Sequence, residues 1–195
     1  MGFVGRNNLH QAMCKKKKEC KTIFRYKLDM IVNMNGQRTI IVIMKNPSTT
    51  MDNVKSSILN YSDKRKSHID RTTGNVLRKL ISMNYDRIVV LNLFPIYATN
   101  PMEINKYYAS NNIKLDKYNK FLRRQILKYN NVPIVCAWGN ASSINLTMYR
   151  NQIQKVYQML NLLNSNIFCY DNMTGKLIPY NFNNNLYPLH GLCWK

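Results

Sequence analysis

Apolar runs separated by polar segments divide the chain into predicted strands. Residues 40–44 are apolar at every position, which is typical of a strand buried on both faces. Residues 87–91 and 132–137 are predominantly apolar and also predict buried strands, and residues 166–170 predict a shorter strand. Buried strands are therefore expected at intervals along most of the chain.

A further strand is predicted ahead of this set. Residues 22–32 mix apolar and polar positions in a strand-like pattern. Asn35-Gly36 follows, and both residues tolerate a positive φ, as a tight hairpin turn requires. The sequence therefore predicts an N-terminal β-hairpin strand that pairs with the buried strand at residues 40–44.

Helical periodicity fills the segments between the buried strands. The predicted helices cover residues 70–81, a short segment from Pro101, residues 116–129 and residues 144–163. Asp70 or Thr72 is placed to cap the first of them. Strands that alternate with helices predict an α/β fold, here a three-layer α/β/α sandwich with a central, mainly parallel sheet.

Polar residues follow several of the predicted strands. Pro47 cannot continue a strand, so Asn46 stands at the carboxyl end of the first buried strand. Asn92 and Gly139 come just past the next two, and His190 lies in the loop after the last. Ligands of open α/β sheets bind at this edge, so we expect these residues to converge on a site.

Charge is the strongest feature of the composition. The 195 residues include 29 Lys and Arg against 9 acidic residues, a net charge of +20. Such an excess favours polyanionic partners, above all DNA, and the absence of an obvious basic amphipathic helix makes a membrane surface the weaker alternative.

The charge also suggests how the chain is divided. Residues 1–20 show little apolar periodicity and include Lys15, Lys16, Lys17 and Lys18. We predict a basic N-terminal arm over these residues, which could lie along a phosphate backbone or form a solvated tail. Residues 21–195 are predicted to form a single domain.

Cysteine usage and hydropathy suggest a cytoplasmic protein. The five cysteines are scattered and form no pattern typical of a metal site, so we expect reduced thiols, no metal and no cofactor. No apolar stretch approaches the ~20 residues that span a bilayer, and no secretory leader is recognisable. We expect a monomer with no obligate protein partner.

Four short segments carry a family resemblance. They are Met44-Lys-Asn-Pro-Ser-Thr49, Val90-Leu-Asn-Leu-Phe-Pro95, Ile134-Val-Cys-Ala-Trp-Gly-Asn140 and Tyr187-Pro-Leu-His-Gly-Leu192. Their order resembles the uracil-DNA glycosylase superfamily, and within it most a bacterial and phage domain-of-unknown-function family, number 1643. Asp70-Arg71-Thr72 fits the Asp-x-Thr motif of that family. The resemblance implies a monofunctional DNA glycosylase that hydrolyses the N-glycosidic bond of a flipped base and leaves an abasic site.

The resemblance also implies roles for individual residues. Asn46 would orient the attacking water, Asn92 would bind the edge of the base, and His190 would stabilise negative charge on the departing base. Phe94 would contact the base, and Ser48 and Thr49 would line the pocket mouth or contact phosphate. Outside the resemblance, we expect Trp138 to contact the base and Arg71 to contact phosphate. Lys45, where the superfamily often has a small residue, is also expected to contact phosphate, with a Schiff base to an abasic sugar as the alternative. Asp70 is a second candidate for activating water.

Several alternatives stay open at the level of sequence. Asn46 is also a typical turn residue before proline, Asp70 a typical helix cap, and Trp138 a typical core residue. Asn46 replaces the Asp of the most active superfamily branch, and an amide cannot act as a general base. The preferred base is therefore expected to be a damaged or modified one, such as a modified pyrimidine of phage DNA, which would suit antiviral defence. The alternative is a protein that binds DNA or a nucleobase on the same fold without cleaving it.

Overall fold

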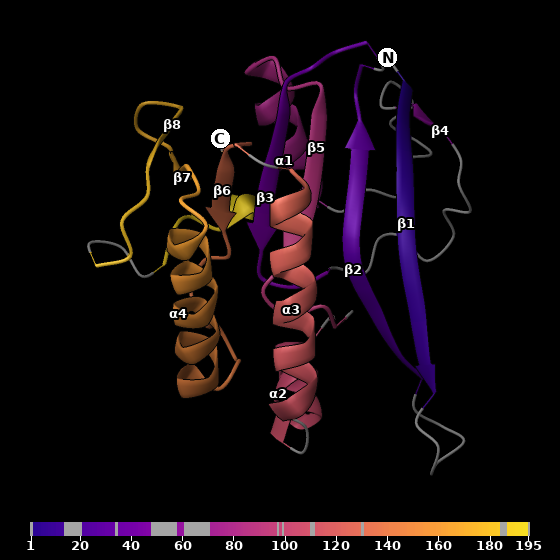
Figure 1. Ribbon diagram of the computed structural model, residues 1–195, viewed down its shortest axis with the longest axis vertical. Helices are drawn as coiled ribbons and strands as arrows, with labels where there is room; N and C mark the ends of the chain where they lie inside the picture. Colours follow the sequence, from indigo (N-terminus) through magenta and orange to yellow (C-terminus); the bar gives the residue numbers. More distant parts are fainter. Residues whose placement is uncertain are drawn as a thin grey trace.

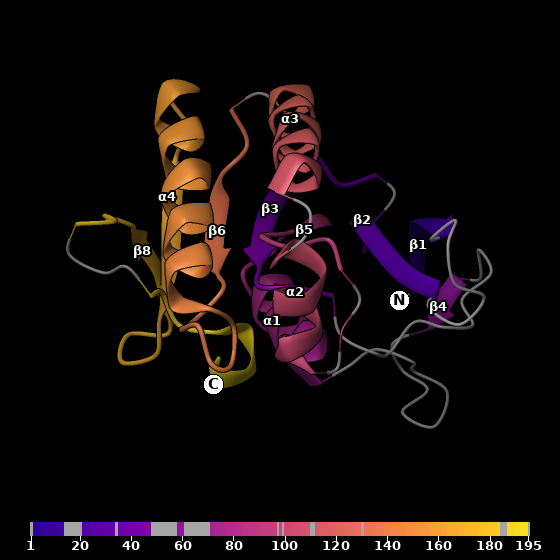
Figure 2. The ribbon, with the colours of Figure 1, turned by 90° about the horizontal axis from the view of Figure 1, so that it is seen from below.

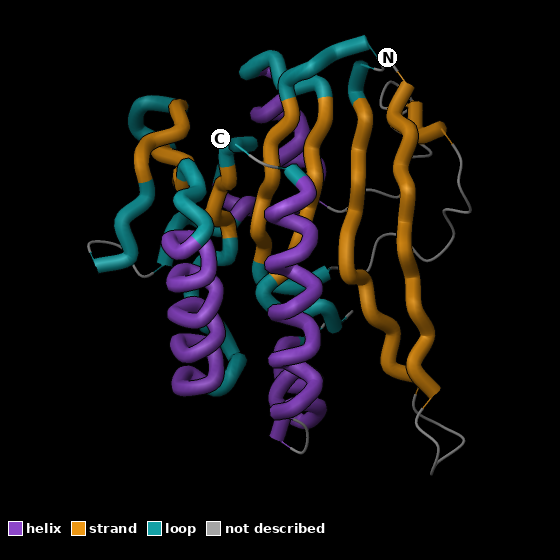
Figure 3. The backbone as a smooth tube through the Cα atoms, in the orientation of Figure 1, coloured by secondary structure: helices purple, strands orange, loops and turns teal. Residues whose placement is uncertain are grey.

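The computed structural model describes residues 2–13, 21–33, 35–47, 58–60, 71–96, 98, 100–109, 112–129, 131–183 and 187–194. In these residues one mixed sheet runs in the order β4-β1-β2-β5-β3-β6-β7-β8 (Figure 1, Figure 3). The strands are β1 (Gly2–Met13), β2 (Lys21–Ile31), β3 (Thr39–Met44), β4 (Ile58–Asn60), β5 (Arg87–Asn92), β6 (Ile134–Ala137), β7 (Ile167–Asp171) and β8 (Lys176–Pro179).

The predicted buried strands form the parallel centre of the sheet. β3 pairs in parallel with β5 on one side and β6 on the other, and β6 pairs in parallel with β7. All the other strand pairings are antiparallel among the described residues. The sheet is therefore mixed rather than mainly parallel, because strands of opposite direction extend its parallel centre at both edges.

The predicted hairpin between β2 and β3 is wrong. β5 lies between these strands, antiparallel to β2 and parallel to β3. The connecting loop passes over the start of β5, where the Asp86 carbonyl accepts from Val32 N at 2.7 Å and the Asp86 side chain accepts from Arg38 N at 3.0 Å. Gly36 allows this close approach, since a Cβ there would lie 1.9 Å from Asp86 Cγ.

The N-terminal segment joins the sheet instead of forming a free arm over its whole length. β1 pairs antiparallel with β2 from Val4 to Met13, and its first residues pair with β4. The four lysines of the predicted arm, 15–18, lie outside the described residues. A strand that adds to the open edge of β2 satisfies backbone groups that would otherwise face solvent.

Helices cover both faces of the sheet, as expected for an α/β fold. They are α1 (Arg71–Ser82), α2 (Pro101–Ala109), α3 (Asn112–Lys128), α4 (Leu146–Leu162) and the short η1 (Gly191–Cys193). Val76, Leu77 and Leu80 of α1 pack on one face, and α2, α3 and α4 contribute to the core on the other. Figure 2 shows α3 and α4 on the side of the sheet opposite to η1. In the described part of the chain, none of the helices has the length and hydropathy of a membrane span.

An ion-pair cluster joins the antiparallel strand β2 to the parallel centre. The buried Asp29 carboxylate of β2 accepts from Arg87 at 2.8 and 2.6 Å and from Lys27 at 3.1 Å. Burial tends to raise the pKa of Asp29, but these cationic partners outweigh it and hold that pKa below its usual value. The cluster therefore holds β2 beside β5 through charge-assisted hydrogen bonds.

Candidate functional site at the carboxyl edge of the sheet

The carboxyl ends of the three central strands meet at one edge. Met44 of β3 stands in register with Asn92 of β5 and with Ala137 of β6. The chain stays paired just beyond the strands, since Leu93 N donates to Met44 O at 2.7 Å and Phe94 N to Lys45 O at 3.0 Å. The segments that carry Asn46, Asn92 and Gly139 are thus held side by side by the backbone.

The Asn92 side chain is the most unusual polar group at this edge. It is fully buried, and neither its amide nitrogen nor its amide oxygen has a hydrogen-bond partner in the described structure. Because it is in register with Met44, it faces the layer of α1 and η1. An unpaired buried polar group costs about 1–3 kcal/mol, so this amide is poised to gain from a ligand that pairs with it.

His190 lies directly against the backbone after β6. Gly139 N donates to Pro188 O at 3.0 Å, which ties the two loops together. Gly139 has a φ of +66°, and a Cβ at this position would lie 2.7 Å from His190 Cβ. Leu192 N donates to His190 Nδ1 at 3.3 Å, so in the neutral imidazole the proton resides on Nε2. In that tautomer Nε2 carries the N–H of the ring.

Asn46 uses its amide nitrogen within the turn. Nδ2 donates to Pro47 O and to Ala98 O, each at 3.0 Å. These bonds fix the side chain and leave Oδ1 as its group for accepting a hydrogen bond from water. An amide oxygen can orient water but cannot take its proton.

Lys45 is buried rather than set on the surface for phosphate. Its exposed fraction is 8%, and Nζ donates to Ser142 Oγ at 3.0 Å. Nζ also lies 5.8 Å from the centre of the Tyr149 ring. Burial lowers the pKa of this lysine, because charge is disfavoured away from water. This placement does not suit the predicted contact with the DNA backbone.

The two aromatic residues predicted to contact the base belong to the core. Phe94 has an exposed fraction of 0% and packs against the rings of Tyr108 and Tyr149. Trp138 is equally buried, and its ring meets Tyr180 edge to face. Direct stacking of a base on either ring would require these neighbours to separate.

Of the remaining predicted site residues, one is exposed and the others lie outside the residues that the structure describes. Arg71 is the first residue of α1 and is exposed. Ser48, Thr49 and Asp70 lie outside the described residues, as do Lys15, Lys16, Lys17 and Lys18.

The outer face of α3 carries a cationic stripe that the sequence analysis did not single out. Lys117, Lys120, Arg124 and Lys128 are all exposed, and their spacing of three or four residues places them along one face of the helix. The same spacing is visible in the sequence. Asp116, the acidic residue next to the stripe, pairs at 3.0 Å with Lys155 of α4. The stripe therefore remains strongly positive.

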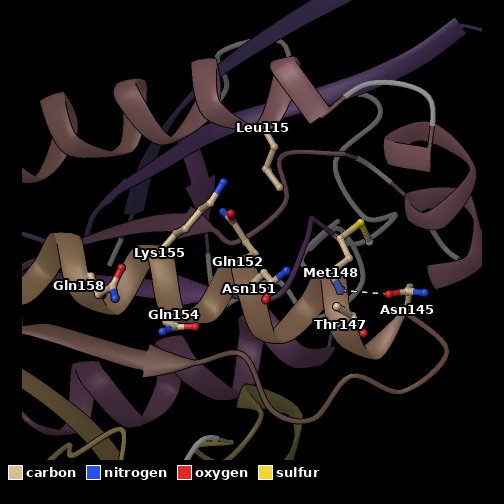
Figure 4. Close-up of a pocket in the computed structure, with 9 residues that line it drawn as sticks. All are labelled: Leu115, Asn145, Thr147, Met148, Asn151, Gln152, Gln154, Lys155 and Gln158. Atoms are coloured by element: carbon tan, nitrogen blue, oxygen red, sulfur yellow. Dashed lines mark hydrogen bonds between the residues drawn. The ribbon is translucent and has the colours of Figure 1, made fainter.

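A separate cavity of about 610 Å³ lies between α3 and α4 (Figure 4). Its lining includes four amide side chains of α4, those of Asn151, Gln152, Gln154 and Gln158, with Leu115 of α3 on the other side. The buried amide of Gln152 is satisfied, because it donates to Leu93 O at 2.9 Å and exchanges hydrogen bonds with Asn119. This cavity lies along α4, and its lining does not include Asn46, Asn92 or His190.

A comparison with known protein families finds a match. The sequence profile of a family described as "Protein of unknown function (DUF1643)" matches residues 25–178. No curated protein and no solved structure matches the chain significantly. The matched region includes the strand ends that carry Asn46, Asn92 and Gly139, and it stops before His190.

Proposed function

The chain belongs to this family, DUF1643, and from the chemistry of its strand-end residues we propose that it is a DNA glycosylase. It would hydrolyse the N-glycosidic bond of a flipped damaged or modified base and leave an abasic site. The observation that carries the proposal is the buried Asn92 amide, whose two polar atoms lack partners in the described part of the chain. A carboxamide offers a donor beside an acceptor, which complements the hydrogen-bonding edge of a pyrimidine.

The departing base would need a hydrogen-bond donor on its anionic side. His190 supports this role because its Nδ1 accepts from Leu192 N, which leaves the proton of the neutral ring on Nε2. A donor placed where negative charge develops contributes on the order of 100–1000-fold in rate. The contact of His190 with Gly139 would hold the ring in a fixed position relative to the sheet edge.

The attacking water would be held by Asn46. Its amide nitrogen is anchored on Pro47 O and Ala98 O, so Oδ1 would accept from water in a fixed direction. Orientation suffices if the sugar already has oxocarbenium character when water adds, because the water proton is lost after the bond forms. This mechanism requires no general base at position 46.

Affinity for DNA would come from the basic surface. The α3 stripe of Lys117, Lys120, Arg124 and Lys128 supplies exposed cations for phosphate. Contacts of this kind act on any sequence and weaken steeply with salt. They would retain the protein on DNA while a base is sampled at the sheet edge.

The proposal is tested with oligonucleotides that carry uracil, oxidised pyrimidines or hydroxymethylated and glycosylated pyrimidines, single-stranded and in duplexes. After incubation, hot alkali converts each abasic site into a strand break. We expect breaks at one class of modified base, reduced on the order of 100-fold or more in His190→Ala. Folded protein that yields no break with any of these bases would contradict the proposal.

One observation favours a second function, binding without cleavage. The Asn46 amide nitrogen is committed to two backbone carbonyls, as expected for a residue whose role is to shape the turn. A protein of this kind would hold a flipped base on Asn92 and release no product. Tight binding of the modified oligonucleotide that survives both Asn46→Ala and His190→Ala, without abasic sites, would identify it.

A further inference from the structure

A buried lysine and an exposed serine form a pair that base excision does not use. Lys45 Nζ lies 3.0 Å from Ser142 Oγ, although 97 positions separate the two residues. The lysine is buried at the end of β3, whereas Ser142 is exposed in the loop between β6 and α4. Among the described residues no carboxylate pairs with Lys45. A buried ammonium without a counter-ion is costly, which favours the neutral amine.

The described neighbours of Lys45 include no negative charge, although the face of the Tyr149 ring attracts a cation. The Tyr149 ring lies beneath it, and the Tyr149 hydroxyl donates to Trp138 O and Gly139 O at 3.0 and 2.8 Å. Burial raises the pKa of Tyr149, so this residue brings no negative charge to stabilise an ammonium.

Ser142 has an unusual, left-handed backbone conformation. Its φ is +53°, in the left-handed region that residues with a side chain seldom adopt. Residues held in such conformations cluster at functional sites. The Ser142 hydroxyl donates to Asn140 Oδ1 at 3.2 Å, so its oxygen is fixed between Asn140 and the lysine. This oxygen thus belongs to an exposed residue and accepts a hydrogen bond from the buried lysine.

We propose that Ser142 is a nucleophile activated by Lys45, and that the pair reacts with carboxylic esters. Ser142 Oγ would bond to the ester carbonyl carbon as its proton passes to Lys45 Nζ. The carbon–oxygen bond to the leaving alcohol breaks, and the alcohol takes that proton from Lys45. Water then attacks the acyl-serine, releases the carboxylic acid and restores the hydroxyl. The activity is independent of base excision.

A fluorophosphonate, which phosphonylates activated serines and releases fluoride, tests the pair directly. The full-length protein is labelled, and the modified residue is mapped by mass spectrometry. Ser143 is the matched control, since it is exposed in the same loop. We expect label on Ser142 and not on Ser143, loss of label in Ser142→Ala, and unchanged labelling in Ser143→Ala.

The variant Lys45→Arg distinguishes two roles of Lys45, that of a base and that of a structural hydrogen-bond donor. Arginine can still donate a hydrogen bond, but it cannot be deprotonated and so cannot act as a base. We expect roughly 100-fold slower labelling in this variant. In the wild type, labelling should rise with pH and level off below pH ~10, the usual lysine range. Equal labelling of Ser142 and Ser143, or a Ser142 rate that does not depend on Lys45 in folded protein, would overturn the proposal. The wild-type mapping and pH profile decide the matter if Lys45→Arg does not fold.

Discussion

The side chain of His190 rests on the backbone of Gly139, at a spot where any other residue would place a carbon 2.7 Å from His190 Cβ. The glycine is needed twice, for its φ of +66° and for the room it leaves. Two loops distant in sequence are thereby joined at the carboxyl edge of the sheet. The position of the imidazole therefore depends on the absence of a side chain at residue 139.

Gly139→Ala should move His190 and impair base excision. We expect a loss of about 1–2 kcal/mol in the free energy of unfolding from the left-handed backbone, and a further cost from the clash. Excision should fall roughly 10–100-fold, less than the full loss of a charge-stabilising donor. Chemical denaturation and single-turnover excision measure the two effects.

Gly175→Ala is the matched control. Gly175 has the same φ of +66°, but a Cβ there would approach only the Tyr170 hydroxyl, at 3.9 Å. It should lose comparable stability and keep its excision rate. Equal excision by the two variants would show that the contact with His190 does not matter.

Asn92→Leu should separate stability from function. Because the Asn92 amide has no partner in the described structure, an apolar side chain of similar size should leave the free energy of unfolding unchanged or raise it by about 1–3 kcal/mol. Excision should be lost. Thermal and chemical denaturation check the first expectation and the oligonucleotide assay the second.

Asn119→Leu serves as the comparison, since the Asn119 amide exchanges hydrogen bonds with Gln152 at 2.8 and 3.1 Å. That variant should lose about 1 kcal/mol or more. If Asn92→Leu proved equally destabilising, the Asn92 amide would have a structural partner and could not be held ready for a base.

The centre of the fold could be predicted because its strands contain uninterrupted apolar runs, such as residues 40–44 and 88–91. β3 and β5 were recognised within one or two residues from that feature, and the parallel arrangement then places Asn46 and Asn92 at the same edge. β8 was missed because Lys176–Pro179 is mostly exposed and shows no alternation. The hairpin was predicted wrongly because a glycine that permits a tight turn looks the same in sequence as one that permits contact with Asp86.

Acid should weaken the fold through Asp29. Its pKa is lowered in the folded state, so the unfolded chain binds the proton more tightly. This contribution to stability is complete above the unfolded value of about 3.9 and is lost as the pH falls through the lower folded value. Chemical denaturation from pH 7 to pH 2 should therefore show a decline beginning near pH 4–5.

Asp29→Asn should remove that part of the pH dependence and lower stability at neutral pH by roughly 2 kcal/mol. Asp116→Asn is the control, because the Asp116–Lys155 pair is exposed and should contribute little. If the free energy of unfolding of Asp29→Asn declined in acid as it does in the wild type, Asp29 would not be the source of this pH dependence.

The α3 stripe should determine much of the salt dependence of DNA binding. Neutralising Lys120 and Arg124 together, as glutamines, should weaken binding and reduce the slope of log affinity against log salt by about 0.9 for each lost phosphate contact. Fluorescence anisotropy over a salt series measures this slope. Arg78→Gln with Lys176→Gln removes two exposed cations elsewhere and should change it little.

The candidate site was only partly accessible to sequence reasoning. Strand-end residues follow from topology, but the environment of each side chain depends on contacts across the fold. The sequence around Lys45 suits a phosphate contact, whereas in the structure its nitrogen lies beside Ser142, 97 positions away. Phe94 follows a strand end much as Asn92 ends one, yet it turns into the core between two tyrosines.

Release of a free base is the defining product of the proposed glycosylase and can be measured directly. Phage DNA with modified pyrimidines and matched oligonucleotides are incubated with the wild type and with Asn92→Leu, and small molecules are analysed by mass spectrometry. We expect one free base released by the wild type, an equal number of abasic sites in the DNA, and neither product from the folded variant. Release of no base from any of these DNAs by folded wild-type protein, or equal release by Asn92→Leu, would contradict the proposed function.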